Sequence, residues 1–233
     1  MPFKQRAIAV EDKEERRQAI LDAAEKLFVK HRDRMASVSE VAQAAGLAKG
    51  TVYLYFASKE EMLLALHERH TGAFFARFME LMGSGKSLGF DEIFEVAHAH
   101  FIAPPGALAL TSWCFAMMDR EMPLEAAVAF KVRVGAVVGA AGTALERHFP
   151  TLGPGDGARL LQHSLSLIVG LWQFIHPNLR FERALDRAGA KVFMRDYDKE
   201  VRAAIYALWS GTVAPLENMD AKPRISAVKG KKA

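Results

Sequence analysis

The chain has 233 residues and a formal net charge of +4; hydrophobic residues make up 51% of it and charged residues 25%. This balance is that of a soluble globular protein and excludes a wholly disordered chain. A single cysteine, Cys114, excludes a disulfide scaffold and fits a reducing compartment. Residues 221–233 hold five basic residues and no acid, so net charge alone makes no case for a nucleic-acid partner.

The first predicted helix covers residues 14–30, where apolar residues recur at intervals of three and four, the spacing of one helix face. A second helix is predicted to begin after Ser37. Ser37 and Glu40 have the spacing of a capping box, in which each side chain accepts a hydrogen bond from the other residue's backbone. Gly46 is a natural stop for this helix, because glycine readily adopts the left-handed conformation that ends helices.

A short helix is predicted over residues 48–55, and a second capping box, Ser58 with Glu61, opens a long helix over residues 59–82. Five further helical stretches, separated by proline and glycine, are predicted at 90–102, 106–120, 123–148, 155–176 and 181–210. Alternating strand patterns of useful length are absent, so the predicted fold class is all-α. From Pro215 onward the helical periodicity fades, and residues 215–233 are expected to form a disordered basic tail.

The stretch from Ser37 to Lys59, SVSEVAQAAGLAKGTVYLYFASK, predicts a helix, a tight turn and a second short helix. Val52 and Phe56 are expected to be the buried residues of the second helix, which contains no acid. Its outward residues suit a DNA major groove: lysine for phosphate, threonine and tyrosine for hydrogen bonds, and glycine for close backbone approach. The candidate DNA-binding residues are Lys49, Gly50, Thr51, Tyr53, Leu54, Tyr55 and Lys59. A core-packing role for this short helix is the alternative.

Residues 14–66 resemble the DNA-binding domain of the tetracycline-repressor (TetR) family. The resemblance includes the string G-x-x-K-G-T-x-Y-x-Y-F-x-S-K-E, here Gly46 to Glu60. It implies a homodimeric transcription factor that binds a palindromic double-stranded DNA operator and carries a small-molecule pocket in its C-terminal domain. Most members of the family are repressors, so repression is the expected activity. The resemblance also implies that Thr51 and Tyr53 lie nearest the bases and that Tyr55 and Lys59 lie nearest the phosphates.

The chain departs from the family pattern between the first two helices. Arg32, Asp33 and Ala36 stand where the family usually has a Gly-aromatic pair and a threonine, and Met35 is a candidate substitute for the missing aromatic. The expected domains are a DNA-binding domain, a ligand-binding and dimerisation domain, and the tail, over residues 1–58, 59–214 and 215–233.

The C-terminal helices contain aromatic, methionine and histidine side chains within apolar stretches. This mixture predicts a mostly apolar cavity with a few polar groups, suited to a small hydrophobic or aromatic effector. The candidate lining residues are Phe94, His98, Phe101, Trp113, Met117, Phe130, Val134, Trp172, Gln173 and His176. Each of them taken singly is more often an ordinary core residue, which is the alternative.

The last two long helices are apolar over more than one stripe, which predicts burial on two sides in a dimeric four-helix bundle. The candidate dimer-interface residues are Leu161, Ser164, Ile168, Leu171, Ile205, Leu208 and Trp209. A monomer core with one extra layer is the alternative. Effector binding is expected to move the 59–82 helix, which belongs to both domains, and so to weaken operator binding.

No enzyme, cofactor or metal site is expected, because nucleophile motifs and metal-ligand spacings are missing from the sequence. The longest apolar run, Val134 to Leu145, is too short to span a bilayer, and a signal-peptide core is lacking, so we expect a cytoplasmic protein with no membrane partner. Gly135 and Gly139 in that run have the spacing of a close helix contact. The competing functional classes are an all-helical ligand-binding scaffold that does not read DNA and an enzyme with a buried active site.

Overall fold

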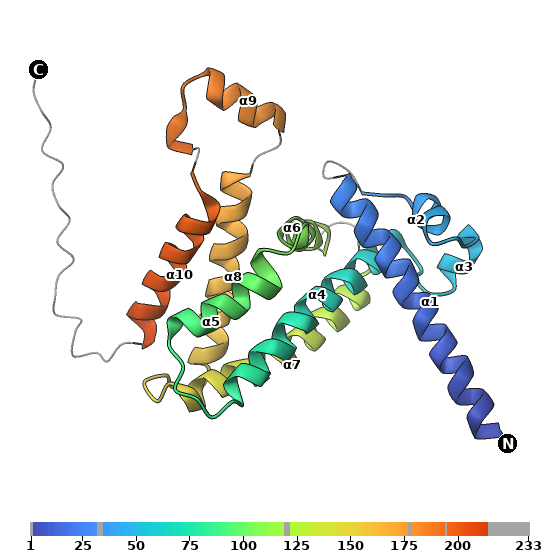
Figure 1. Ribbon diagram of the computed structural model, residues 1–233, viewed down its shortest axis with the longest axis horizontal. Coiled ribbons are helices and arrows are strands. Elements are labelled where there is room, and N and C mark those ends of the chain that lie inside the picture. The colour runs from blue at the N-terminus through green and yellow to red at the C-terminus, as the bar shows by residue number, and fades with distance from the viewer. Residues whose placement is uncertain (1, 32–34, 119–121, 177–178, 194, 214–233) are drawn as a thin grey trace, which may run out of the picture.

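The computed structural model describes residues 2–31, 35–118, 122–176, 179–193 and 195–213, and every regular element in these ranges is helical (Figure 1). The elements are α1 (Pro2–Lys30), α2 (Val38–Ala44), α3 (Lys49–Tyr53), α4 (Lys59–Met82), α5 (Phe90–Ala97) with its π-helical continuation η1 (His98–Ile102), α6 (Ala107–Met118), α7 (Leu124–His148), α8 (Asp156–Ile175), α9 (Leu179–Arg187), the short 3₁₀ helix η2 (Lys191–Phe193) and α10 (Tyr197–Val213). The all-α fold class is confirmed. The predicted tail, residues 215–233, lies outside the described ranges.

Local signals in the sequence set the boundaries of the first helices. The Ser37 hydroxyl accepts a hydrogen bond from the Glu40 backbone N–H at 3.3 Å, and the Glu40 carboxylate accepts one from the Ser37 N–H at 2.9 Å. The predicted capping box is therefore confirmed. Gly46 follows α2 with a φ of +69°, a left-handed conformation that side chains other than glycine rarely adopt.

The helix α4 begins and ends at the predicted residues, although its cap differs from the predicted box. The Ser58 hydroxyl accepts from the Glu61 N–H at 3.1 Å, as expected. The Glu61 carboxylate, however, accepts from the Ala57 N–H at 2.7 Å. The glutamate reaches one residue beyond the cap, so one backbone donor of the first turn, the Glu61 N–H, and one before the cap, the Ala57 N–H, are satisfied.

Helices α1, α2 and α3 pack with the first turns of α4, with α6 and with the start of α7 around one apolar core. The core includes Ile20, Val41, Val52 and Leu66, each 0 or 1% exposed. Val52 and Phe56 are buried as predicted. Met35 lies partly buried against the same core, and Ala36 is buried, whereas Arg32 and Asp33 lie outside the described residues.

A second core lies among α4, α5, α7, α8 and α10. Its most deeply buried members are Phe78, Ala141, Leu145, Leu160 and Val201. Helices α4 and α7 run side by side, and α8 packs between α7 and α10 (Figure 1). Helix α4 contributes Leu66 to the first core and Phe78 to the second, so it extends through both parts of the molecule. Helices α6 and α7 also contribute residues to both cores.

Helices α7 and α8 make their closest contact at a pair of glycines. A Cβ built at Gly157 would overlap the carbonyl oxygen of Gly142, and one built at Gly142 would overlap the Ala158 backbone. The pair singled out in the sequence, Gly135 and Gly139, has open space at the corresponding positions. The prediction of a close helix contact at that pair was therefore wrong, because spacing within one helix does not say which face meets a neighbour.

The predicted final helix over residues 181–210 was also wrong. The structure divides this segment into α9, η2 and α10, and Gly189 breaks it with a φ of +72°. The Ala190 N–H donates to the Leu185 carbonyl at 3.0 Å, a bond that closes the end of α9. Helix α9 projects from the end of the α8–α10 pair (Figure 1).

By length and composition alone, helix α7 is long and apolar enough to cross a membrane. The bent pair formed by α5–η1 and α6 meets the same criterion if it is counted as one span. The run from Val134 to Leu145, interrupted only by Thr143, underestimates the apolar length of the helix, because α7 as a whole includes apolar residues on both sides of Lys131 and Arg133. Only 22% of the apolar window is buried inside the protein. Much of the apolar surface of α7, including the side chains of Val128 and Val132, is therefore exposed to solvent in the single chain.

Candidate functional site

The surface of α3 carries most of the predicted DNA-binding residues. Lys49 and Gly50 are exposed, and Tyr53 and Leu54 are 45% and 79% exposed. The Lys49 ammonium lies over the Tyr53 ring, 5.9 Å from its centroid, so a cation and a hydroxyl stand together on the outward face. Thr51 and Tyr55 are half-buried, and Tyr55 packs partly against the first core.

A shallow groove lies between the exposed face of α3 and the start of α4. It includes Lys49 and Tyr53 together with Lys59, whose ammonium is 3.4 Å from the Glu60 carboxylate. Sequence reasoning missed the six further lining residues, which are Ser37, Val38, Ser39, Ala57, Ser58 and Glu60. The signal for them was the pair of capping serines, because residues that cap neighbouring helices stand beside the free N–H groups of the first turns.

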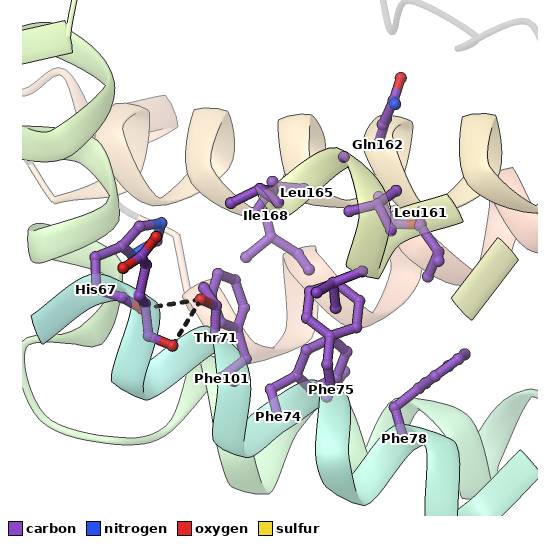
Figure 2. Close-up of a pocket in the computed structure, with 18 of the residues that line it drawn as sticks. His67, Thr71, Phe74, Phe75, Phe78, Phe101, Leu161, Gln162, Leu165 and Ile168 are labelled. Carbon is purple, nitrogen blue, oxygen red and sulfur yellow. Dashed lines mark hydrogen bonds between the residues drawn. The ribbon is translucent and has the colours of Figure 1, made fainter. Parts of the chain in front are cut away.

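A cavity of about 640 Å³ lies in the C-terminal part, which is within the usual size range of small-molecule sites. It follows α4 from His67 to Phe78, and at 1.5 Å per residue this distance is about 16 Å. In Figure 2, Phe74 and Phe75 rise from α4 toward Leu161, Leu165 and Ile168 of α8. The remaining walls come from α5, η1, α6, α7 and α10.

Four of the ten predicted pocket residues line this cavity: Phe94, Phe101, Phe130 and Val134. The other six lie elsewhere. Met117 is buried in the first core, Trp113 is 40% exposed, and His98 faces Asp198 at 3.6 Å. Gln173 donates to the Ser112 hydroxyl at 2.6 Å, while Trp172 stacks on His176 at the far end of α8. Helical spacing selected the apolar helices but not the turns that face the cavity.

The sequence reasoning missed the contribution of α4, whose phenylalanines form one wall of the cavity. Phe74, Phe75 and Phe78 recur at intervals of one and three residues, so they cover one side of the helix. Phe74 also lies 5.8 Å, centroid to centroid, from Phe101. The three phenylalanines were visible in the sequence, but nothing in their spacing separates a cavity wall from a core.

One end of the cavity is polar. His67 is 4% exposed and contacts Thr111, with 3.4 Å between its Nδ1 and the hydroxyl oxygen. The Thr71 hydroxyl donates to the backbone carbonyl of His67 at 2.9 Å (Figure 2). Burial, and then the nearby His70 and Lys131, lower the pKa of His67 from 6.5 to about 4, so its imidazole is neutral at neutral pH.

The buried imidazole of His67 predicts a pH-dependent stability. Between pH 6.5 and about 4 the unfolded chain binds a proton at this residue that the folded chain excludes, so the free energy of unfolding falls as pH falls. The shift corresponds to about 3 kcal/mol over the window. We expect His67→Gln to lose about 2 kcal/mol less stability than the wild-type chain between pH 7 and pH 4.5, measured by urea unfolding, because this interval covers only part of that window. An equal loss in both proteins would contradict the assignment.

Opposite the cavity, the same turns of α4 hold α1. Arg69 donates to Asp22 at 2.6 Å and to Glu25 at 2.5 Å, and His70 Nε2 lies 2.8 Å from the second Glu25 oxygen. Arg69 also donates to Gln18 at 3.3 Å. Residues on one side of this stretch therefore line the cavity, while their immediate neighbours bind the helix that supports α2 and α3.

Four of the seven predicted dimer-interface residues are buried inside the single chain. Ser164, Ile168, Ile205 and Trp209 are buried in the second core, and Leu161, Leu171 and Leu208 pack partly buried against it. The Trp209 indole N–H donates to the Ser164 hydroxyl at 2.9 Å. The four buried side chains are covered within the single chain, whereas Leu161, Leu171 and Leu208 keep part of their surface open.

Comparison with known proteins places both parts of the chain in one family. Residues 20–66 match the model of bacterial regulatory proteins of the tetR family, and residues 68–215, more than half of the chain, match that of the tetracyclin repressor-like C-terminal domain. The fatty acid degradation regulator FadR from Bacillus halodurans has the same fold, with a TM-score of 0.50 and 19% identity over 86% of this chain and 95% of that one.

Individual relatives match over a shorter stretch. The fatty acid metabolism regulator protein of Bacillus subtilis is 39% identical over 61 residues, which are 26% of this chain and 31% of the relative. The transcriptional repressor KstR2 of Rhodococcus jostii is 34% identical over 70 residues, 30% of this chain and 34% of the relative. The chain thus aligns with about a third of each of these proteins. With both family models matched in order and the helical fold in agreement, the chain belongs to the TetR family of bacterial transcriptional regulators.

Proposed function

We propose that this protein is a homodimeric cytoplasmic repressor that binds a palindromic DNA operator and leaves it when a small apolar effector enters the cavity. The observation that carries the proposal is the position of α4. This helix begins at the groove beside α3, holds α1 through Arg69, and lines the cavity from His67 to Phe78. A ligand that moves α4 therefore acts on the helices that carry the DNA-facing residues.

The proposed domain division is 1–58 for DNA binding and 59–214 for effector binding and dimerisation. On the DNA side, Thr51 and Tyr53 are proposed to contact bases, and Lys49, Tyr55 and Lys59 to contact phosphates. Leu54 and Gly50 complete the surface: Leu54 offers apolar contact to a thymine methyl, and Gly50 has nothing within 4 Å of a built Cβ, which leaves room for close approach. In a two-fold symmetric dimer that binds successive major grooves on one side of the DNA, the two copies of α3 would lie about 34–36 Å apart, which is one turn of the double helix.

The proposed dimer face is the outward side of α8 and α10. Several of its exposed residues have small side chains, which allow two helix pairs to approach closely. They include Ser166 and Gly170 of α8 and Ala203, Ala207 and Ser210 of α10. Two copies joined on this face form a four-helix bundle, as predicted from the sequence, but with residues that the single chain leaves uncovered.

The names of the relatives support an apolar effector. Two of the similar proteins are described as regulators of fatty acid metabolism or degradation, and a third as a repressor. A cavity walled by phenylalanines and leucines is compatible with a molecule that carries a hydrocarbon chain. Repression agrees with the description of KstR2 as a repressor. Another relative, FasR of Mycolicibacterium smegmatis, is described as an activator. It is 40% identical over 58 residues, which are 25% of this chain and 26% of that protein.

The proposal is tested by selecting duplexes from a random DNA pool with the purified full-length chain. We expect a two-fold symmetric consensus. On that DNA, Lys49→Ala is expected to weaken binding several-fold and to reduce the slope of log affinity against log salt by about 1, because one phosphate contact is lost.

Lys86→Ala is the matched control, because Lys86 is an exposed lysine between α4 and α5, outside the groove and the cavity. It should bind the selected DNA as the wild-type chain does. Selection without enrichment of any sequence, or equal affinities for Lys49→Ala and the wild type, would favour a helical scaffold that does not read DNA.

A further inference from the structure

The charges that line the cavity lie together at one end. Glu68, Lys131 and Arg133 are the charged carboxylate, ammonium and guanidinium groups among the described lining residues, and all three stand where the first half of α4 meets α7. The other end is walled by Phe78, Phe90 and Trp209 with aliphatic neighbours. The cavity is therefore amphipathic along its length.

Two of the three charges neutralise each other. The Arg133 guanidinium donates to the Glu68 carboxylate, with N–O distances of 2.6 and 2.8 Å. Lys131 forms none of the ion pairs found among the described residues; its ammonium lies 5.4 Å from the centroid of the Phe115 ring. Of the histidines nearby, His67 is neutral, and His70 faces Glu25 on the other side of α4. One uncompensated positive charge is left at this end of the cavity.

The apolar end offers no comparable attraction for a polar group. Its hydroxyl and indole groups bond to each other: the Ser164 hydroxyl donates to the Leu160 carbonyl at 2.8 Å and accepts from the Trp209 indole N–H at 2.9 Å. In Figure 2, the side chain of Gln162 points away from the space between α4 and α8. A polar group placed there would lose its hydrogen bonds to water without replacement.

We propose that the cavity takes an elongated amphipathic anion, with its negatively charged group at Lys131 and its hydrocarbon chain extending along α4 toward Phe78 and Trp209. This inference rests on the proposed function, in which the same cavity binds the effector. The length of about 16 Å along α4 favours a chain of many carbons over a compact aromatic molecule. The anion also lies within one turn of the Arg69 contacts with α1, where a shift of α4 bears most directly on the DNA-binding part.

The test compares two ligands with the same chain and different head groups, dodecanoate and its neutral methyl ester, below the concentration at which dodecanoate forms micelles. Binding to the full-length chain is measured by calorimetry. We expect the wild-type chain to prefer dodecanoate. Lys131→Met should weaken dodecanoate binding about tenfold and leave ester binding unchanged, because only the acid loses a charge-assisted contact.

Lys131→Arg keeps the charge and should keep the preference, and Lys86→Met should behave as the wild-type chain does. Thermal unfolding of each variant checks that the fold is retained. Equal losses for acid and ester in Lys131→Met, or no loss for either, would overturn the anion site while the apolar effector cavity stands. Absence of binding of both ligands to the wild-type chain would overturn the assignment of the cavity as well.

Discussion

Replacement of Gly157 by alanine is expected to lower the free energy of unfolding by about 3 kcal/mol or more. The added methyl group would overlap the Gly142 carbonyl, so α7 and α8 have to separate along their line of closest contact. Separation exposes buried neighbours such as Leu145 and Leu160 and opens voids in the second core. The gain in helix propensity from alanine, about 1 kcal/mol, is too small to offset this.

Gly139→Ala on α7 is the matched control. A Cβ at Gly139 has nothing within 4 Å, so alanine there is expected to be neutral or to stabilise the helix by up to about 1 kcal/mol. The stability of both variants is measured by urea unfolding followed by circular dichroism. The protein concentration is held fixed, because the midpoint of the proposed dimer would depend on it. Equal stability of the two variants would show that the contact between α7 and α8 is looser than described.

Replacement of Arg69 by methionine is expected to uncouple the two parts of the chain. The variant retains the cavity, because Arg69 is not among its lining residues, but loses the hydrogen bonds to Asp22, Glu25 and Gln18. We expect dodecanoate to bind nearly as it does to the wild-type chain. Its effect on operator affinity should shrink to less than about threefold, from the 5- to 150-fold typical of coupled sites.

Arg77→Met controls for the loss of an arginine from the same helix. Arg77 pairs with Glu80 of α4 itself, at 2.7 Å, and makes no contact with α1 among the contacts described above. Its response to the ligand should equal that of the wild-type chain. A full ligand response in Arg69→Met would mean that another contact transmits the movement, such as the packing of Phe28 and Val29 against the loop at Gly106.

The sequence was sufficient for features that depend on neighbouring residues in the chain. The capping box at Ser37 and the bounds of α4 follow from a hydroxyl, a glutamate and a run of apolar residues, all within a few positions. The buried Val52 and Phe56 follow from helical period alone. These predictions succeeded because the deciding interactions are local.

The failures concern contacts between distant segments. Trp172 and His176 satisfied the pattern of a pocket, yet they stack on each other at the end of α8. Ile168 and Trp209 satisfied the pattern of an interface, yet they are buried in the single chain. An apolar helix that is covered on two sides has the same sequence pattern whether the second side faces the same chain, a second chain or a cavity. Only the packing of α8 between α7 and α10 separates these cases.

Occupation of the cavity is proposed to reach the DNA-binding surface through α4. The most direct test is the dissociation constant of the full-length wild-type chain for its selected operator, at fixed salt, as dodecanoate is raised through the range in which calorimetry shows it to bind. We expect this constant to rise at least fivefold and then to level off when the cavity is saturated. A constant that stays the same while the cavity fills would contradict the proposed coupling.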